Sequence, residues 1–280
     1  MLLQRKWEQQ FQKGYSNLNR DNNYMITLSR GEILDFNKLG FIVLRQYYSA
    51  NEILKILDEV NLLESLIPKK DSMMKYYDTP FGEDSSNQSM ILIRIEKFIE
   101  TSPYLESIVN NPSVHLLLNQ LFGESAVLMK EKINFKPPGS PPDLLHQDSQ
   151  AGWDEYGSEF VSVLIAVEDS NRSNACVEFD HSGNYINRLE APLWEPLTAK
   201  DIPNAEMIPI ETKAGDIILF NSYVPHGSEA NTSDKRRCNI YLTYNKASDG
   251  NHRLKYFSEK RKNYPPNNER DPNQEYSFKV

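Results

Sequence analysis

Residues 130–148 read KEKINFKPPGSPPDLLHQD and end in the triplet His146-Gln147-Asp148. Side chains alternate along a β-strand, so a His and an Asp two residues apart on one strand point to the same face. A second His on a neighbouring strand would complete a set of two imidazoles and one carboxylate with open coordination positions, as in non-haem iron oxygenases. We therefore expect His146 and Asp148 to be two of three metal ligands.

The missing ligand is expected in residues 215–245, which read GDIILFNSYVPHGSEANTSDKRRCNIYLTYN. A short strand there leads to His226, the third expected metal ligand. Arg237 begins the next strand, and its guanidinium can bind a carboxylate through two parallel hydrogen bonds. Ser228 offers a hydroxyl for the same carboxylate. Arg236 points to the other face of the strand and is kept as the alternative to Arg237.

The composition bounds the kind of partner. The chain has 280 residues, a net charge of −8 and a pI of about 5.3, which argues against general nucleic-acid or anionic-membrane binding. No run of about 18 apolar residues is present, and the polar stretch 1–12 lacks the apolar core of a signal peptide. Cys176 and Cys238 have no metal-site spacing and are expected to be reduced. We expect a cytoplasmic monomer or homodimer that acts on a small molecule.

The expected helices all lie before residue 124, and from Ala126 onward the patterns are those of strands and loops. Apolar residues recur at helical spacing in residues 29–40, 49–66, 102–111 and 112–123. Strands are expected in segments 41–48, 73–78, 90–100, 126–136, 159–169, 174–180 and 238–247. Two more are expected within residues 208–230, separated by Ala214-Gly215-Asp216. Residues 188–207 form a Pro-containing connection without regular pattern, which we expect to be part of a lid.

This order predicts an α+β protein with a mainly β core and N-terminal helices packed on one side. Residues 1–30 are polar and Asn-rich and predict an arm with one short helix. Residues 31–280 predict a single domain, with the β core at about 125–246 and a C-terminal extension at 247–280.

From about Leu34 to Pro266 the sequence resembles the phytanoyl-CoA dioxygenase family of Fe(II)- and 2-oxoglutarate-dependent oxygenases. The likeness lies in residues 34–53, in the HxD motif at His146-Gln147-Asp148, and in His226 as the distal His. Arg237 stands where the family binds the far carboxylate of 2-oxoglutarate, and Ser228 where a helper hydroxyl stands. The resemblance implies a double-stranded β-helix, the cupin-like jelly roll.

A narrower resemblance is to the hydroxylases of 2-aminoethylphosphonate and trimethylaminoethylphosphonate. It rests on residues 130–139, 146–153, 225–237, 241–250 and 256–266. Two departures occur at the border of the expected pocket. Residues 174–178 read NACVE where the family commonly has Asn-Gly-Cys-Leu-Glu, and residues 180–183 read DHSG where Gly-Ser-His usually follows. These departures bear on the substrate more than on the cofactors.

The resemblance implies that Fe(II) is held by His146, Asp148 and His226, and that 2-oxoglutarate and O2 are cosubstrates. Lys132 and Asn134 share a strand face with Lys130 and are expected to line the cosubstrate site. Halogenases of this class have a small residue in place of the carboxylate, so Asp148 implies hydroxylation. The implied activity is hydroxylation of an unactivated C–H bond in a small polar substrate, with an aminophosphonate as the best candidate.

Five residues are candidates for substrate binding. Lys130 and Arg94 would present positive charge to a phosphonate or carboxylate, whereas Trp153 and Tyr156 would pack on an ammonium group and Asp249 would pair with it. Two alternatives stay open. One is a hydroxylase of an amino acid, an amine or a natural-product intermediate, and the other is a jelly-roll protein that binds a metal or ligand without turnover.

Overall fold

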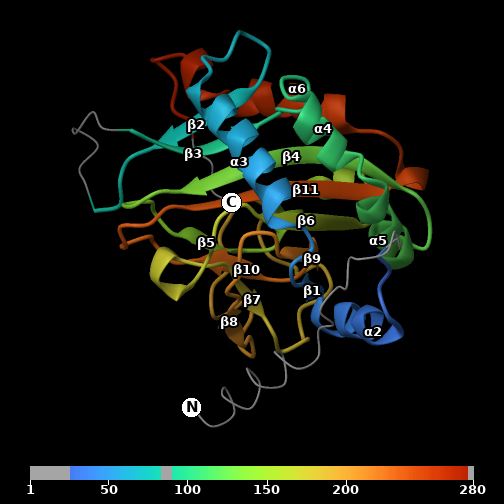
Figure 1. Ribbon diagram of the computed structural model, residues 1–280. Helices are drawn as coiled ribbons and strands as arrows, with labels where there is room; N and C mark the ends of the chain where they lie inside the picture. Colours follow the sequence, from blue (N-terminus) through green and yellow to red (C-terminus); the bar gives the residue numbers. More distant parts are fainter. Residues whose placement is uncertain (1–25, 83–89, 277–280) are drawn as a thin grey trace.

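Two β-sheets packed against each other form the centre of the molecule, and helices cover one outer side (Figure 1). The structure is a computed structural model that describes residues 26–82 and 90–276. The arm and short helix predicted for residues 1–30 fall largely on residues 1–25, outside the described residues. The division into an arm, a single domain and a C-terminal extension stays a prediction.

Four of the described helices lie where the sequence predicts them. Their ends follow from local chemistry: Ser49 caps α3 and accepts a hydrogen bond from the Glu52 backbone, while the Glu52 carboxylate accepts one from the Ser49 backbone. Gly40 and Gly123 end α2 and α5 in the left-handed conformation that glycine adopts without strain. The helices of the described ranges are α2 (Arg30–Leu39), α3 (Ala50–Ser65), α4 (Pro103–Val109), α5 (Pro112–Phe122) and α6 (Arg253–Asn263).

The strands form a seven-stranded and a four-stranded antiparallel sheet. The large sheet has the order β1-β9-β6-β11-β4-β3-β2 and the small sheet the order β5-β10-β7-β8. Strands of the large sheet are β1 (Phe41–Leu44), β9 (Ile217–Asn221), β6 (Phe160–Ala166), β11 (Arg237–Lys246), β4 (Ala126–Lys136), β3 (Ile91–Glu96) and β2 (Met74–Asp78). Those of the small sheet are β5 (Asp143–His146), β10 (His226–Ser228), β7 (Glu178–Asp180) and β8 (Met207–Pro209).

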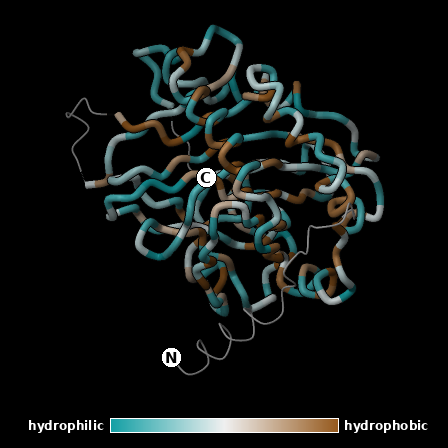
Figure 2. The backbone as a smooth tube through the Cα atoms, in the orientation of Figure 1, coloured by the Kyte–Doolittle hydropathy of each residue, from teal (hydrophilic) through white to brown (hydrophobic). Residues whose placement is uncertain are grey.

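Hydrophobic clusters on both sides of the large sheet hold the layers together. One cluster joins the outer face of the sheet to the helices, with Ile56 of α3 and Leu117 of α5 packed against strand residues such as Ile133. A second cluster, which includes Phe179 and Phe220, lies between the two sheets. Figure 2 shows hydrophobic segments through the middle of the molecule and mostly hydrophilic outer loops. Burial of these side chains contributes about 1.5–3 kcal/mol each.

The predicted fold class, an α+β jelly roll with helices on one side, is confirmed. No element was assigned within the predicted C-terminal extension, and the structure forms α6 there. Residues Tyr256 and Phe257 of this helix join Met74, Met129 and Trp153 in a third buried cluster. No helix in the described part of the chain is long and apolar enough to cross a membrane.

Candidate active site

The pairing of two short strands brings His146 and His226 together. They are directly opposite each other in the antiparallel pair β5–β10, and their ring centroids are 4.4 Å apart. Asp148 joins them, so that one ligand atom from each of the three residues lies within 4.8 Å of the others. In the described part of the chain, no other group of three such residues could hold a metal ion.

The expectation that His146 and Asp148 share one strand needs a correction. Strand β5 ends at His146, and Asp148 begins the short 3-10 helix η1 (Asp148–Ala151). The two side chains still converge because Gln147 between them keeps extended dihedral angles, with φ −99° and ψ 135°.

Backbone carbonyls orient both imidazoles. His146 Nδ1 lies 2.6 Å from the Leu144 carbonyl oxygen, and His226 Nδ1 lies 3.0 Å from that of Val224. A carbonyl oxygen only accepts, so each Nδ1 carries the proton and donates, which leaves each Nε2 lone pair available to a metal. Burial lowers the pKa of both imidazoles, that of His146 to about 3, so both are neutral near pH 7.

The carboxylate has the complementary state. Burial acts to raise the pKa of Asp148, but the basic side chains around it, Lys130 first, outweigh burial, and the pKa is lowered to about 2. Two neutral imidazoles and one ionised carboxylate are the donor set that suits Fe(II) in oxygenases with open positions. The residues present therefore fit the implied metal.

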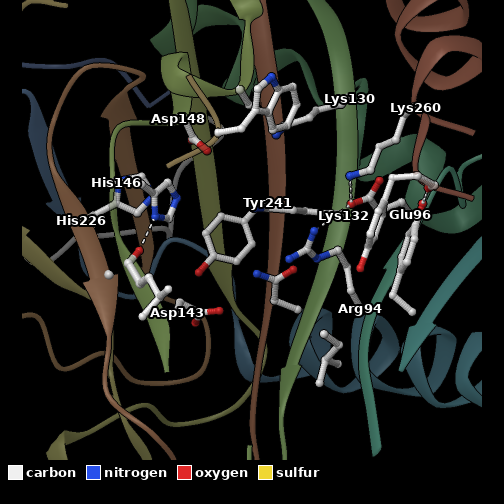
Figure 3. A pocket seen from close by; sticks show the side chains of 18 of the residues that line it. Arg94, Glu96, Lys130, Lys132, Asp143, His146, Asp148, His226, Tyr241 and Lys260 are labelled. Atoms are coloured by element: carbon white, nitrogen blue, oxygen red, sulfur yellow. Dashed lines mark hydrogen bonds and ion pairs between the residues drawn. The ribbon is translucent and has the colours of Figure 1, made fainter. Parts of the chain in front are cut away.

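A cavity of about 560 Å³ opens in front of this triad. Its walls come from β2, β3, β4, β5, β10, β11 and α6, and from the loop that carries Leu193 and Trp194. Figure 3 shows the triad on one side of Tyr241 and Arg94, Glu96, Lys130 and Lys260 on the other. The volume lies in the range of small-molecule sites.

Arg237 marks one end of the cavity, which we call the cosubstrate end and define by Arg237, Lys136 and Asp143. The Arg237 side chain is 1% exposed, its Nη1 donates to the Ala175 carbonyl, and its Nη2 lies 3.5 Å from Asp143 Oδ2. Its buried Nε has no hydrogen-bond partner among the residues that the structure describes. A buried guanidinium with an open donor fits the carboxylate of a dicarboxylic acid.

Ser228 lies beside this end, and its hydroxyl proton is donated to Asp143. Its Oγ donates to Asp143 Oδ2 at 2.6 Å and accepts from Lys136 Nζ at 2.6 Å. Lys136 Nζ also donates to Asp143 Oδ2 at 3.0 Å. Burial acts to raise the pKa of Asp143, but the Lys136 and Arg237 charges outweigh burial and hold that pKa far below its usual range.

The Arg236 side chain lies on the opposite side of the large sheet. Its guanidinium pairs with Glu168 at 2.8 Å and with Glu64 of α3 at 2.8 Å. Arg237 therefore lines the cavity and Arg236 does not. Of the two arginines that the sequence offers for the cosubstrate, the geometry favours Arg237.

The opposite end of the cavity, which we call the cationic end, is defined by Arg94, Lys130, Lys260 and Glu96. Glu96 accepts from Lys260 at 2.7 Å and lies 3.5 Å from Arg94. Burial raises the pKa of Glu96, but Lys260 and Arg94 outweigh burial and lower it to about 2.

Lys130 is the most confined cation of the cationic end. Its side chain is buried, its ammonium lies 3.8 Å from the centre of the Trp153 ring, and no described carboxylate forms an ion pair with it. Burial and the charge of Lys132 lower its pKa well below the usual value. An anion in the cavity would favour the charged form of this lysine.

The other candidates from the sequence divide into two groups. Lys132, Asn134 and Tyr156 line the cavity, with Lys132 Nζ 4.8 Å from the centre of the Tyr241 ring. Trp153 is fully buried behind Lys130 rather than in the cavity wall. Asp249 lies outside the cavity wall, and its carboxylate accepts from the Ser158 backbone at 2.9 Å.

Sequence reasoning missed the residues that α6 contributes, Tyr256, Glu259 and Lys260, and also Glu96 and Asp143. Glu96 carried a usable signal, because it alternates with Arg94 and apolar residues along one expected strand. The α6 residues lie in the segment 256–266 that carries the narrower resemblance, but nothing in this polar segment indicates that it folds back onto the barrel.

Two glutamines fasten the predicted lid to the triad loop. Gln147 donates through Nε2 to the Asn187 carbonyl at 2.9 Å and accepts from the Leu189 backbone at 3.0 Å. Gln150 donates to the carbonyls of Pro192 and Glu195. Both glutamine side chains are buried, so the position of residues 187–197 depends directly on the loop that carries Asp148.

Comparisons with known proteins agree with this geometry. The model of the phytanoyl-CoA dioxygenase family matches residues 36–238. The 2-aminoethylphosphonate dioxygenase of the uncultured bacterium HF130_AEPn_1 is 35% identical over 239 residues, which cover 85% of this chain and 89% of that protein. The methylphosphonate hydroxylase of Gimesia maris is 26% identical over 239 residues, covering 85% and 88%. The crystal structure of EctD from S. alaskensis with 2-oxoglutarate and 5-hydroxyectoine shares the fold, with a TM-score of 0.67, 20% identity and coverage of 81% and 79%.

Proposed function

The chain belongs to the phytanoyl-CoA dioxygenase family and is an Fe(II)- and 2-oxoglutarate-dependent dioxygenase, and on that premise we propose that it hydroxylates a C–H bond of a small phosphonate. An aminophosphonate such as 2-aminoethylphosphonate is the best candidate. Membership of this enzyme family decides against the non-catalytic alternative. Its cytoplasmic location and its state as a monomer or homodimer stay predictions.

We assign the metal to His146, Asp148 and His226, and the far carboxylate of 2-oxoglutarate to Arg237, with Lys132 and Asn134 beside it. When bound, iron and 2-oxoglutarate activate O2, one oxygen atom enters the substrate as hydroxyl, and the other enters succinate as CO2 leaves. The chain's own part is to hold these groups in place and to exclude water. The carbonyls of Leu144 and Val224 fix the imidazoles for that purpose.

The observation that carries the substrate class is the charge of the cationic end. Three cationic side chains, Arg94, Lys130 and Lys260, surround one buried carboxylate, Glu96. With an anion bound, which favours the charged form of Lys130, this end of the cavity has an excess of two positive charges. A phosphonate carries close to two negative charges near neutral pH, by analogy with a phosphate ester at about −1.5 to −2, whereas a carboxylate or sulfonate carries one.

The ammonium of an aminophosphonate needs a different contact. Tyr156 and Tyr256 line the cavity, and Glu259 beside them accepts a hydrogen bond from the Tyr156 hydroxyl. Aromatic faces and a carboxylate are suitable partners for an ammonium group. These residues replace Trp153 and Asp249 in that role.

A series of isosteres tests this proposal. The rate of succinate release should be measured with 2-aminoethylphosphonate, 2-aminoethanesulfonate and β-alanine, which share the aminoethyl group and differ in head-group charge. We expect kcat/KM for the phosphonate to exceed the other two by roughly 10- to 1,000-fold, since one extra charge a few Å from a partly desolvated cation is worth about 1–4 kcal/mol. Asp148→Ala is the control and should abolish turnover.

Equal or better turnover of the sulfonate or of β-alanine would contradict the phosphonate assignment. The alternative of an amino-acid or amine hydroxylase would then take its place, with the dioxygenase activity unaffected.

A further inference from the structure

Asp143 is a carboxylate held inside the cosubstrate end, where the site must also accept a carboxylate of 2-oxoglutarate. Its Oδ2 accepts from Lys136 at 3.0 Å and from Ser228 at 2.6 Å, and it lies 3.5 Å from Arg237 Nη2. The Asp143 side chain is 43% exposed, and it lines the cavity. Lys136 and Arg237 also line the cavity but are almost fully buried, so Asp143 is the most exposed member of the group.

The two ends of the cavity differ in their excess of positive charge. The cosubstrate end has two cations, Lys136 and Arg237, against Asp143. The cationic end has three cations against Glu96. Lys132 lies between the two ends, near Tyr241 (Figure 3). One end is therefore matched to a single negative charge and the other to two.

We propose that Asp143 is a specificity-determining residue that keeps doubly charged head groups out of the cosubstrate end. This inference rests on the proposed function, in which a carboxylate cosubstrate and a phosphonate substrate enter the same cavity. Without Asp143, the cosubstrate end would have an excess of two positive charges, from Lys136 and Arg237, the same excess as the cationic end. Arg237 also has an Nε without a hydrogen-bond partner in the described residues, so a phosphonate would be attracted to both ends. With Asp143, a single carboxylate neutralises the cosubstrate end, whereas a phosphonate there would carry one unbalanced negative charge.

The position of Asp143 is fixed, which discrimination by charge requires. Ser228 and Lys136 hold the carboxylate from β10 and β4, and Asp143 itself begins β5. It is therefore tied to three strands of the barrel and cannot swing away from an incoming anion without losing these bonds. A fixed charge at a site discriminates against the wrong ligand by repulsion.

The test is a displacement titration on the Fe(II)-loaded enzyme without oxygen. Bound 2-oxoglutarate is followed by its visible charge-transfer absorption and is displaced with inorganic phosphate or with succinate. In Asp143→Asn, we expect phosphate to displace 2-oxoglutarate at a concentration at least roughly tenfold lower than in the wild type, because one repelling charge is gone. Succinate, which places one carboxylate at this end, should shift less than phosphate.

Asp78→Asn is the matched control. The exposed Asp78 also lines the cavity, but its carboxylate accepts a hydrogen bond from the backbone N–H of Thr79 and is not part of the cosubstrate end. It should behave as the wild type. Unchanged phosphate competition in Asp143→Asn would overturn the proposal. The proposal would also be overturned if Asp143→Ala bound 2-oxoglutarate more weakly than the wild type while Asp143→Asn bound it normally. That pattern would mean that residue 143 positions Arg237 through hydrogen bonds and does not discriminate by charge. Binding of phosphate needs no turnover, so this outcome is independent of whether 2-aminoethylphosphonate proves to be the substrate.

Discussion

Arg236 and Arg237 are neighbours in the chain with guanidinium groups on opposite sides of the large sheet. Arg237 lines the cavity, while Arg236 pairs with Glu64 and Glu168 near α3. The two residues share charge, size and sequence context, so they form a matched pair for mutagenesis. A difference between their variants reports position alone.

Arg237→Ala should raise the KM for 2-oxoglutarate by roughly 30-fold to a few thousand-fold, since truncating one partner of a buried charge pair costs about 2–5 kcal/mol. Arg236→Ala should leave this KM unchanged and lower thermal stability through loss of two ion pairs. Steady-state kinetics and thermal unfolding of both variants check this. If Arg236→Ala instead raised the KM for 2-oxoglutarate and Arg237→Ala left it unchanged, Arg236 would be the residue that binds the cosubstrate.

Lys260 gives the cationic end a pH dependence. Burial lowers the pKa of this ammonium to about 8, against the opposing effect of Glu96. Above pH 8 Lys260 loses its proton, so the KM for the phosphonate should rise by about tenfold between pH 7 and pH 9, as one charge-assisted hydrogen bond of about 1.5–3 kcal/mol is lost.

Lys260→Arg is the control, because arginine stays charged throughout this range. Titration of the substrate affects both enzymes equally, so the difference between their pH profiles isolates residue 260. Parallel profiles for the two enzymes would show that Lys260 does not contact the anion.

The sequence predicts which residues come together where their spacing along strands fixes the geometry. The HxD triplet, His226 and Arg237 all fall in or beside strands that carry them to one cavity. Asp249 shows that nearness to a motif-bearing segment does not say where a side chain points, because in the structure its carboxylate accepts from the Ser158 backbone outside the cavity wall. Asp143 stands three residues before His146, and nothing in sequence distinguishes it from a solvent-exposed turn carboxylate until Lys136 and Arg237 are placed around it.

At the scale of elements, α6 is the part of the fold that the sequence did not predict. Residues 253–263 read RLKYFSEKRKN and have too few apolar residues for a clear helical stripe. The helix is stabilised by tertiary contacts instead, with Tyr256 and Phe257 buried and Arg253 bonded to Glu131 and Glu100. Helices α2 to α5 were predictable because caps and apolar periodicity agree there.

The connection of residues 188–207 gives an element-scale prediction. Gln150→Ala removes the side-chain bonds to the carbonyls of Pro192 and Glu195, which should loosen this segment over the cavity. We expect more succinate than hydroxylated product, because a site open to water uncouples 2-oxoglutarate consumption from substrate oxidation. Quantifying both products in the same reaction checks the ratio.

Gln120→Ala is the matched control. Gln120 also holds a distant backbone segment through two bonds, to the N–H and carbonyl of Leu28, but it lies outside the cavity wall. Both variants should lose about 1–3 kcal/mol of stability, and only Gln150→Ala should change the ratio. If the ratio of succinate to hydroxylated product stayed at one in both variants, the connection of residues 188–207 would not control the coupling of the reaction.

At the scale of the whole molecule, the barrel provides one cavity with three chemically distinct parts. The small sheet supplies His146 and His226, and Arg237 lies opposite Lys136 at the cosubstrate end. Strand β3 and helix α6 supply the cationic end, with Arg94 and Glu96 from the strand and Lys260 from the helix. This arrangement is the basis for the proposal that a phosphonate substrate binds at the cationic end and the carboxylate cosubstrate at the cosubstrate end.

The most direct measurement is phosphorus NMR of a reaction that contains the Fe(II)-loaded enzyme, 2-oxoglutarate, O2 and 2-aminoethylphosphonate, with succinate quantified in the same sample. The expected result is a new resonance of a hydroxylated phosphonate that grows in step with succinate and is missing when 2-oxoglutarate is omitted. Accumulation of succinate with an unchanged phosphorus spectrum would contradict the proposed function.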